Sequence, residues 1–125
     1  MEIGNYKILE IKKILDGDTV CVDVYLGFNF VRKNTKIRLA RINAPEISNP
    51  ETQQKAFESK IFLQNLMMNG ELILKTLGDK QDKYGRYLGE INVKINEEWV
   101  NINDEMLKTG HAVLYKGIIE EEFVF

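Results

Sequence analysis

Residues 18–27, DTVCVDVYLG, alternate apolar and polar side chains with a period of two. Every second residue from Val20 to Leu26 is Val or Leu, which is the pattern of a β-strand with one face against a core. Turns containing Gly17 and Gly27 connect this segment to further predicted strands at its two ends. The alternation therefore predicts an antiparallel three-strand meander.

Two more strands, with a helix before them, are predicted further along the chain. Asn49 is a suitable helix cap, Pro50 suits the first helical position, and Gly70 is a natural stop. Beyond that helix, residues 71–77 and 86–95 have the composition of strands, and a polar loop separates them. The pattern places one helix between the third and fourth strands.

A shorter helix is predicted near the C-terminal end. A turn at Asn96 and Glu97 precedes it, Asn101 or Asn103 is its cap, and it ends at Gly110. Five strands interrupted by one helix and followed by another predict an α+β, mainly β fold. The leading candidate is the five-stranded oligonucleotide-binding (OB-fold) barrel.

The composition excludes several classes of protein. The chain has 125 residues, of which 44% are hydrophobic and 29% charged, as expected for one globular domain spanning 1–125. No apolar run approaches the ~20 residues of a membrane span. Cys21 is the only cysteine, so no internal disulfide forms. The first ten residues lack the pattern of a secretory signal, so a cytoplasmic location is expected, with secretion after signal removal as the alternative. A monomer is also expected.

Charge is distributed unevenly along the chain. Residues 32–41 carry five Lys or Arg and no acid, whereas residues 117–125, GIIEEEFVF, carry three Glu and no base. The net charge of −2 argues against an indiscriminate polyanion binder. A nucleic-acid contact is therefore expected on one face only.

Asp16 and Asp18 flank Gly17 in the DGD turn. Two carboxylates held close together repel each other unless a proton or a cation intervenes, so the turn is a candidate site for a hard metal ion. A solvated turn without a metal is the alternative, because Asp and Gly are ordinary turn residues.

Two arginines, one glutamate and one tyrosine are the remaining candidates for chemistry. Arg38 lies on the outer face of a predicted strand, opposite its apolar neighbours Ile37 and Leu39, and Arg86 follows the loop DKYG. Guanidinium groups suit phosphate binding. Glu46 follows Pro45, whose ring stiffens the backbone at a position suited to a general base. Tyr84 could stack on a base. Taken alone, each arginine is better explained as a surface residue and Glu46 as a loop acid, and loop tyrosines are common.

Four segments, ILDGDTV, IRLARINAPE, DKYGRYLGEI and INDEMLKTGHA, occur in this order, with the predicted helix between the second and third. Together they resemble the staphylococcal nuclease (thermonuclease) family, over residues 12–115. The resemblance implies an OB-fold barrel that hydrolyses phosphodiester bonds of DNA and/or RNA. It also implies calcium as the cofactor and little sequence preference.

The resemblance implies a role for each candidate. Asp18 would be a metal carboxylate, and Asp16 would act through the water shell of the metal. Arg38 and Arg86 would hold the scissile phosphate, while Glu46 would act as general base toward the attacking water.

The same motifs imply additional contacts and two departures from the family. Lys83 and Tyr84 would contact the neighbouring phosphate and nucleotide, and the backbone carbonyl of Ala44 would add a metal ligand. Asn43 stands where many members carry a second metal-binding aspartate, so weaker calcium binding or a changed metal preference is expected. The segment 117–125 is too short for the third helix of the family.

Two alternatives come from other functional classes. The first is a catalytically weak or silent OB-fold module that only binds nucleic acid. A decayed site is expected to have lost its base or an arginine, yet Arg38, Glu46, Arg86 and Asp18 are all present. The second alternative is a protein-interaction role for the acidic, aromatic tail.

Overall fold

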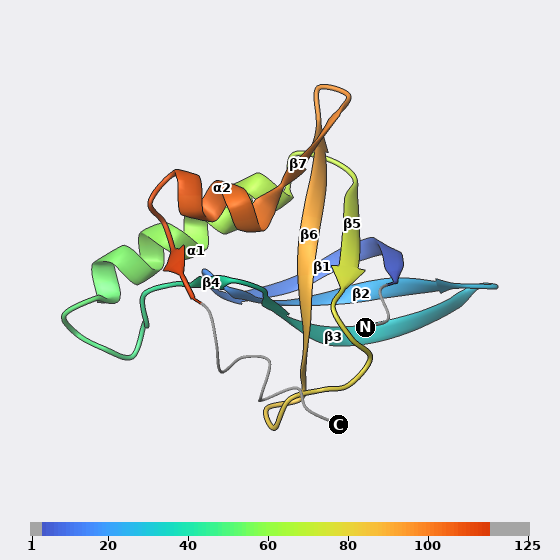
Figure 1. The fold of residues 1–125 in the computed structure, drawn as a ribbon, viewed down its shortest axis with the longest axis horizontal. Coiled ribbons are helices and arrows are strands. Elements are labelled where there is room, and N and C mark those ends of the chain that lie inside the picture. Colours follow the sequence, from blue (N-terminus) through green and yellow to red (C-terminus); the bar gives the residue numbers. More distant parts are fainter. Residues whose placement is uncertain (1–3, 116–125) are drawn as a thin grey trace.

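The computed structural model describes residues 4–115, which form a β-barrel with two helices at one side (Figure 1). The five strands of the barrel are β1 (Asn5–Asp16), β2 (Thr19–Gly27), β3 (Phe30–Leu39), β5 (Leu72–Thr76) and β6 (Arg86–Ile95). Residues 117–125, predicted to be too short for a third helix and considered for a protein-interaction role, fall outside the described residues.

The strand pairing closes the barrel. β1, β2 and β3 form an antiparallel meander, and β5 pairs antiparallel with both β1 and β6. β3 and β6 run parallel to each other and complete the closure. The predicted five-stranded, mainly β barrel is confirmed.

Several shorter elements were not predicted. β6 continues through a turn into β7 (Glu98–Asn101), and β4 (Ile42–Asn43) pairs with β8 (Val113–Leu114). Asn96 and Glu97 have φ of 52° and 66°, the left-handed backbone that a tight hairpin turn requires.

The two helices are α1 (Gln53–Met67) and α2 (Ile102–Lys108), and neither is long and apolar enough to cross a membrane. α1 buries its Ala56, Ser59, Leu63 and Met67 side chains.

The predicted start of α1 is wrong. Asn49 does not cap the helix, because its side-chain oxygen accepts a hydrogen bond from the Glu51 N–H (3.0 Å). Its backbone oxygen accepts another from the Thr52 N–H (3.0 Å), so residues 49–52 form turns. Asn side chains close local turns as readily as they cap helices, and the helix begins only at Gln53.

The apolar face of β2 is buried up to the barrel edge, but Thr19 and Asp23 on its other face are buried as well, so burial does not follow the predicted alternation. Val20, Val22 and Val24 are buried, as predicted. Leu26 follows the same alternation but is 49% exposed, because the outer part of the β2–β3 hairpin projects beyond the barrel (Figure 1).

The structure distinguishes between the two predicted caps of α2. The Asn101 side chain accepts a hydrogen bond from the Asp104 N–H (2.8 Å) and is the cap. Asn103 instead is a fully buried residue of the helix, and its side-chain amide forms hydrogen bonds with backbone groups of the barrel.

Replacing Asn103 by Leu is expected to lower the free energy of unfolding by about 3 kcal/mol or more. Its amide accepts a hydrogen bond from the Ile91 N–H (3.2 Å) and donates to the carbonyls of Ala40 (2.9 Å) and Gly89 (3.2 Å). Leucine has a similar size but leaves these buried backbone groups without that partner. Urea denaturation measures the change; Asn65→Leu on the exposed face of α1 is the control. Equal losses in the two variants would show that the buried amide contributes nothing.

Candidate active site

One cavity of about 330 Å³ brings together residues from four separate parts of the chain. It contains seven of the nine predicted site residues: Asp16, Asp18, Arg38, Asn43, Ala44, Glu46 and Arg86. Pro45 and Tyr115 complete its lining, whereas Lys83 and Tyr84 are not among the lining residues.

The DGD turn packs closely against its surroundings because its central residue is glycine. A Cβ atom on Gly17 would overlap the Ser59 Oγ on α1 and would lie 2.7 Å from the Ala44 Cβ. The missing side chain therefore lets the Asp16 and Asp18 turn approach both α1 and the segment after β4.

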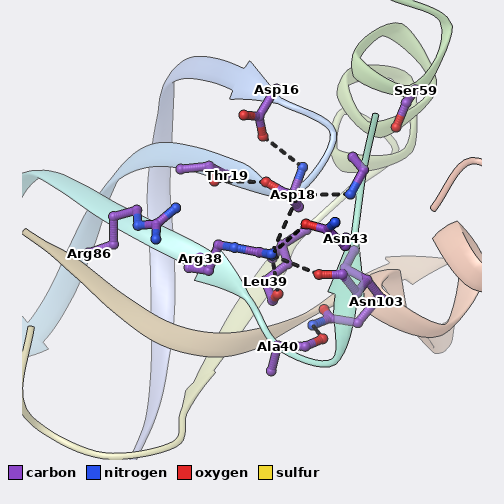
Figure 2. Close-up of polar contacts among 12 residues, drawn as sticks. Asp16, Asp18, Thr19, Arg38, Leu39, Ala40, Asn43, Ser59, Arg86 and Asn103 are labelled. Atoms are coloured by element: carbon purple, nitrogen blue, oxygen red, sulfur yellow. Dashed lines mark hydrogen bonds and ion pairs between the residues drawn. The ribbon is translucent and has the colours of Figure 1, made fainter. Parts of the chain in front are cut away.

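Asp18 is a buried carboxylate held by hydrogen bonds (Figure 2). One oxygen accepts from the Thr19 hydroxyl (3.0 Å), and the other accepts from the Ala44 N–H (2.8 Å). The second oxygen also lies 3.6 Å from Arg38 Nη2. These contacts fix the carboxylate at the floor of the cavity and tie β2 to the segment after β4.

Asp16 lies beside Asp18 and accepts a hydrogen bond from its N–H (3.0 Å). Burial raises the pKa of the Asp16 carboxyl to about 7, and the neighbouring Asp18 carboxylate adds to the rise. The pair consequently favours a shared proton or a bound cation. The side-chain donors are all oxygens, which suits a hard divalent cation such as calcium. Within residues 4–115 no group of three or more His, Cys, Asp or Glu gathers, so the remaining ligands would be uncharged oxygens.

Arg38 is buried, with 5% of its surface exposed, although the sequence pattern placed it on an outer strand face. Its Nη1 donates to the carbonyls of Leu39 (2.9 Å) and Ile42 (2.8 Å). Its Nη2 donates to the Asn43 side-chain oxygen (3.1 Å). These bonds offset the cost of burying the charge and fix the plane of the guanidinium at the cavity.

Asn43 uses its single side-chain oxygen to hold Arg38. The other end of an amide is a donor and cannot bind a cation. An aspartate at this position has two oxygens, so one could accept from Arg38 while the other faced the cavity. The amide therefore gives the site less ligand charge and fewer free oxygens than a carboxylate would.

Glu46 lies at the exposed rim of the cavity, directly after Pro45. No described residue donates a hydrogen bond to its carboxylate or forms an ion pair with it. Its backbone oxygen accepts from the Thr52 hydroxyl (2.8 Å), which ties the loop to the residue before α1. The backbone is anchored while the carboxylate keeps its capacity to accept a proton.

Arg86 is oriented by Asp82, a residue that the sequence patterns did not single out. Arg86 Nε and Nη2 both lie 2.8 Å from one Asp82 oxygen. The other oxygen accepts from the N–H groups of Tyr84 and Arg86 (2.9 Å each). Burial raises the pKa of Asp82, but the bonds from Arg86 outweigh it and hold that pKa below its usual value. A carboxylate four residues before an arginine in DKYGR was the available signal.

A family model described as staphylococcal nuclease homologue matches residues 36–123, which is more than half of the chain. The chain belongs to the staphylococcal nuclease family. The predicted resemblance to this family is thereby confirmed.

Three relatives illustrate the similarity. An uncharacterized protein of Methanocaldococcus jannaschii, MJ1439, is 31% identical over 92% of this chain and 63% of its own length. The probable endonuclease LCL3 of Saccharomyces cerevisiae is 34% identical over 79% of this chain and 39% of its own length. The probable endonuclease LCL3 of Komagataella phaffii is 27% identical over 73% of this chain and 40% of its own length. The chain thus spans less than two thirds of each relative.

The loop of this staphylococcal nuclease homologue also presents Lys83 and Tyr84. Tyr84 is 59% exposed, and its ring centre lies 5.1 Å from Arg86 Cζ and 5.2 Å from Lys83 Nζ. The ring lies beside a cavity arginine without lining the cavity itself. Its contact with substrate stays a prediction.

Tyr115 is the second cavity residue that the sequence patterns missed. Its ring centre lies 5.9 Å from Arg38 Cζ, and its N–H donates to the Arg41 carbonyl (2.7 Å). The tyrosine lies far along the chain from the other lining residues, just beyond β8. Only the tertiary fold brings this ring to the cavity.

Replacing Asn43 by Asp in this family member is expected to lower the calcium concentration needed for half-maximal cleavage, by roughly tenfold for one added ligand charge. Calcium titrations of activity and of heat release both measure the shift. Asn65→Asp adds the same charge on the exposed face of α1 and is the matched control. An unchanged or higher calcium requirement would place residue 43 outside the shell of the metal.

Proposed function

We propose that this protein is a metal-dependent nuclease that hydrolyses phosphodiester bonds of DNA and/or RNA with little sequence preference. The observation that carries the proposal is the gathering in one cavity of two aspartates, two arginines and a glutamate whose carboxylate has no partner among residues 4–115. Membership of the staphylococcal nuclease family supports it, as does the similarity to proteins named probable endonucleases.

Arg38 and Arg86 are the phosphate-binding groups of the proposal. Hydrolysis increases the negative charge on the phosphate oxygens in the transition state. Both guanidinium groups are held by protein acceptors before substrate arrives, so little reorganisation is needed when that charge develops. Such pre-placed charges stabilise the transition state more than the ground state.

Glu46 is the proposed general base. Its carboxylate takes a proton from water as the water oxygen bonds to phosphorus. The bond from phosphorus to the leaving oxygen breaks, and that oxygen takes up a proton from solvent. A position at the cavity rim without a competing donor among the described residues suits this role.

The proposed metal ligands are Asp18, Asp16 through water, Asn43 and the Ala44 carbonyl. Calcium, on which the family generally depends, is the expected ion. When bound, a divalent cation neutralises phosphate charge and lowers the pKa of water. The tendency of the two acids to share a proton supports a cation at this position.

Metal removal tests the proposal. End-labelled single- and double-stranded DNA and RNA are incubated with the protein in calcium, in magnesium or in chelator, and the products are separated on gels. Cleavage is expected with calcium and is expected to stop in chelator. No cleavage under any condition would refute the nuclease, and cleavage that continues in chelator would refute the metal requirement.

A silent nucleic-acid-binding barrel is the second candidate. The occupied Asn43 oxygen favours it, because the site has less ligand charge than two metal-binding aspartates would supply. Binding of labelled oligonucleotide without any cleavage, at calcium concentrations far above the ordinary requirement, would identify this second function.

A further inference from the structure

The β2–β3 hairpin extends beyond the barrel, on the side away from α1 (Figure 1). Two aromatic side chains lie at its end: Phe28 is 93% exposed and Phe30 is 68% exposed. Leu26 and Val31 add further exposed apolar surface beside them. A cluster of exposed apolar side chains at one projecting end indicates a surface that binds something.

The turn at this end is strained. Phe28 and Asn29 have φ of 55° and 67°, so both adopt the left-handed conformation of a tight hairpin turn. Asn and Gly are the usual residues there, whereas a bulky aromatic residue adopts this backbone only at an energetic cost. The turn thus retains a phenylalanine that neither packing in the barrel nor backbone preference explains, which points to a functional role.

A second cavity, of about 210 Å³, lies between the inner face of this hairpin and the open end of the barrel. Tyr6 from β1 and Tyr87 from β6 line it, together with Leu26 and Arg32 from the hairpin. Arg32 Cζ lies 5.3 Å from the centre of the Tyr87 ring. Aromatic rings with an adjacent guanidinium form a surface on which flat, π-rich ligands stack.

This second cavity and the candidate active site lie on opposite faces of the β3–β6 pair. Lys36 is paired with Arg86, and Ile37 with Tyr87. Successive strand residues point to opposite faces, so Arg86 lines the catalytic cavity while its neighbour Tyr87 lines the hairpin cavity.

The charge of the hairpin selects the class of ligand. Residues 24–45 contain no acidic residue, and Arg32, Lys33 and Lys36 follow one another along β3. Asp79 is the one acidic residue among those that line the hairpin cavity. Positive charge combined with exposed aromatic rings fits a polyanion whose bases are free to stack, as in single-stranded nucleic acid.

We propose that two groups of residues, here named together the aromatic cradle, bind unpaired bases of a single-stranded substrate across the β3–β6 pair from the cleavage site. They are Tyr6, Arg32 and Tyr87 in the hairpin cavity, and Phe28 and Phe30 at the hairpin end, outside the lining of that cavity. The cradle makes single strands the preferred substrate class, because the bases of a duplex are already stacked on one another. The choice of nucleic acid as the ligand rests on the proposed nuclease function. The exposed aromatic residues and the strained turn at the hairpin end indicate a binding surface independently of that function.

Fluorescence anisotropy in chelator tests the cradle, with gels verifying that the probes stay intact. The probes are an oligothymidylate of about ten nucleotides, within the span of one OB-fold, an abasic oligomer of equal length, and the corresponding duplex. The double variant Phe28→Asn/Phe30→Thr keeps the turn and strand preferences while removing both rings. We expect it to weaken oligothymidylate binding by at least about tenfold and to leave abasic binding unchanged.

Phe57→Gln is the matched control, because Phe57 is 45% exposed on α1 and far from the hairpin. It is expected to bind as wild type does. The Tm of the double variant, expected to equal or exceed that of wild type, shows that the variant folds. Arg32→Gln is a second variant and should weaken binding to every single-stranded probe while lowering the salt dependence.

Three results would overturn the cradle. In the first, wild type binds the abasic and the base-bearing probes with equal affinity. In the second, the double variant binds oligothymidylate as tightly as wild type does. In the third, the double variant loses binding to anionic lipid vesicles but to no nucleic-acid probe. Cleavage activity is measured separately. If wild type does not cleave but the double variant loses binding, the cradle stands and the nuclease fails; the reverse pattern refutes only the cradle.

Discussion

Replacing Glu46 by Gln is expected to lower the rate of phosphodiester cleavage by about 10²–10⁴-fold, the usual contribution of a general base. Glutamine has nearly the same shape but cannot take a proton from water. The Glu46 carboxylate has no partner among the described residues, so the substitution breaks no contact and should leave the free energy of unfolding unchanged. Single-turnover cleavage of a labelled oligonucleotide at saturating calcium measures the loss.

Glu51→Gln is the matched control, since Glu51 is exposed only a few residues away, in the turns before α1. It should retain wild-type activity. Full activity in Glu46→Gln would exclude Glu46 as the base, whatever the other site variants do.

Replacing Arg86 by Gln is expected to lower the cleavage rate by about 10²–10³-fold, the typical effect of removing one pre-placed donor from a transition state. Because Arg86 is partly exposed at the cavity, its guanidinium can contact substrate, and single-turnover cleavage measures the loss. Arg86→Lys keeps the charge but loses the planar pair of donors, so it should recover only part of the rate.

The buried partner of Arg86 requires its own control. Removing the arginine leaves the Asp82 carboxylate, whose side chain is fully buried, without its counter-charge. The double variant Arg86→Gln/Asp82→Asn should recover stability in urea denaturation but should not recover cleavage. If cleavage returned together with stability, Arg86 would act through folding and not on the phosphate.

The strand pattern and the motifs predicted most of the barrel and most of the candidate site. A period of two over Val20 to Leu26 reflects the local geometry of a strand, so it is visible without the tertiary structure. The motifs likewise contained seven residues that line one cavity. These residues could be recognised without the fold because each motif is a short, local stretch of sequence. Local signals failed at Asn49, where an amide closes a turn instead of capping a helix.

Residues that act through distant partners were not predictable in this way. Tyr115 was missed, because its importance depends on Arg38 lying beside it in the folded chain. Asp82 differs, because its position four residues before Arg86 was a local signal. The competition of Arg38 for the Asn43 oxygen was also hidden, since the sequence shows an amide but not what it contacts.

The sequence by itself determined a mainly β chain with the residue types of a phosphodiester-cleaving site, because alternation and motif composition are local properties. Only the tertiary structure decided which of these residues meet. The parallel pairing of β3 with β6 places Arg86 at one cavity and Tyr87 at another. That pairing joins segments about fifty residues apart, and no local pattern in either strand encodes the partner.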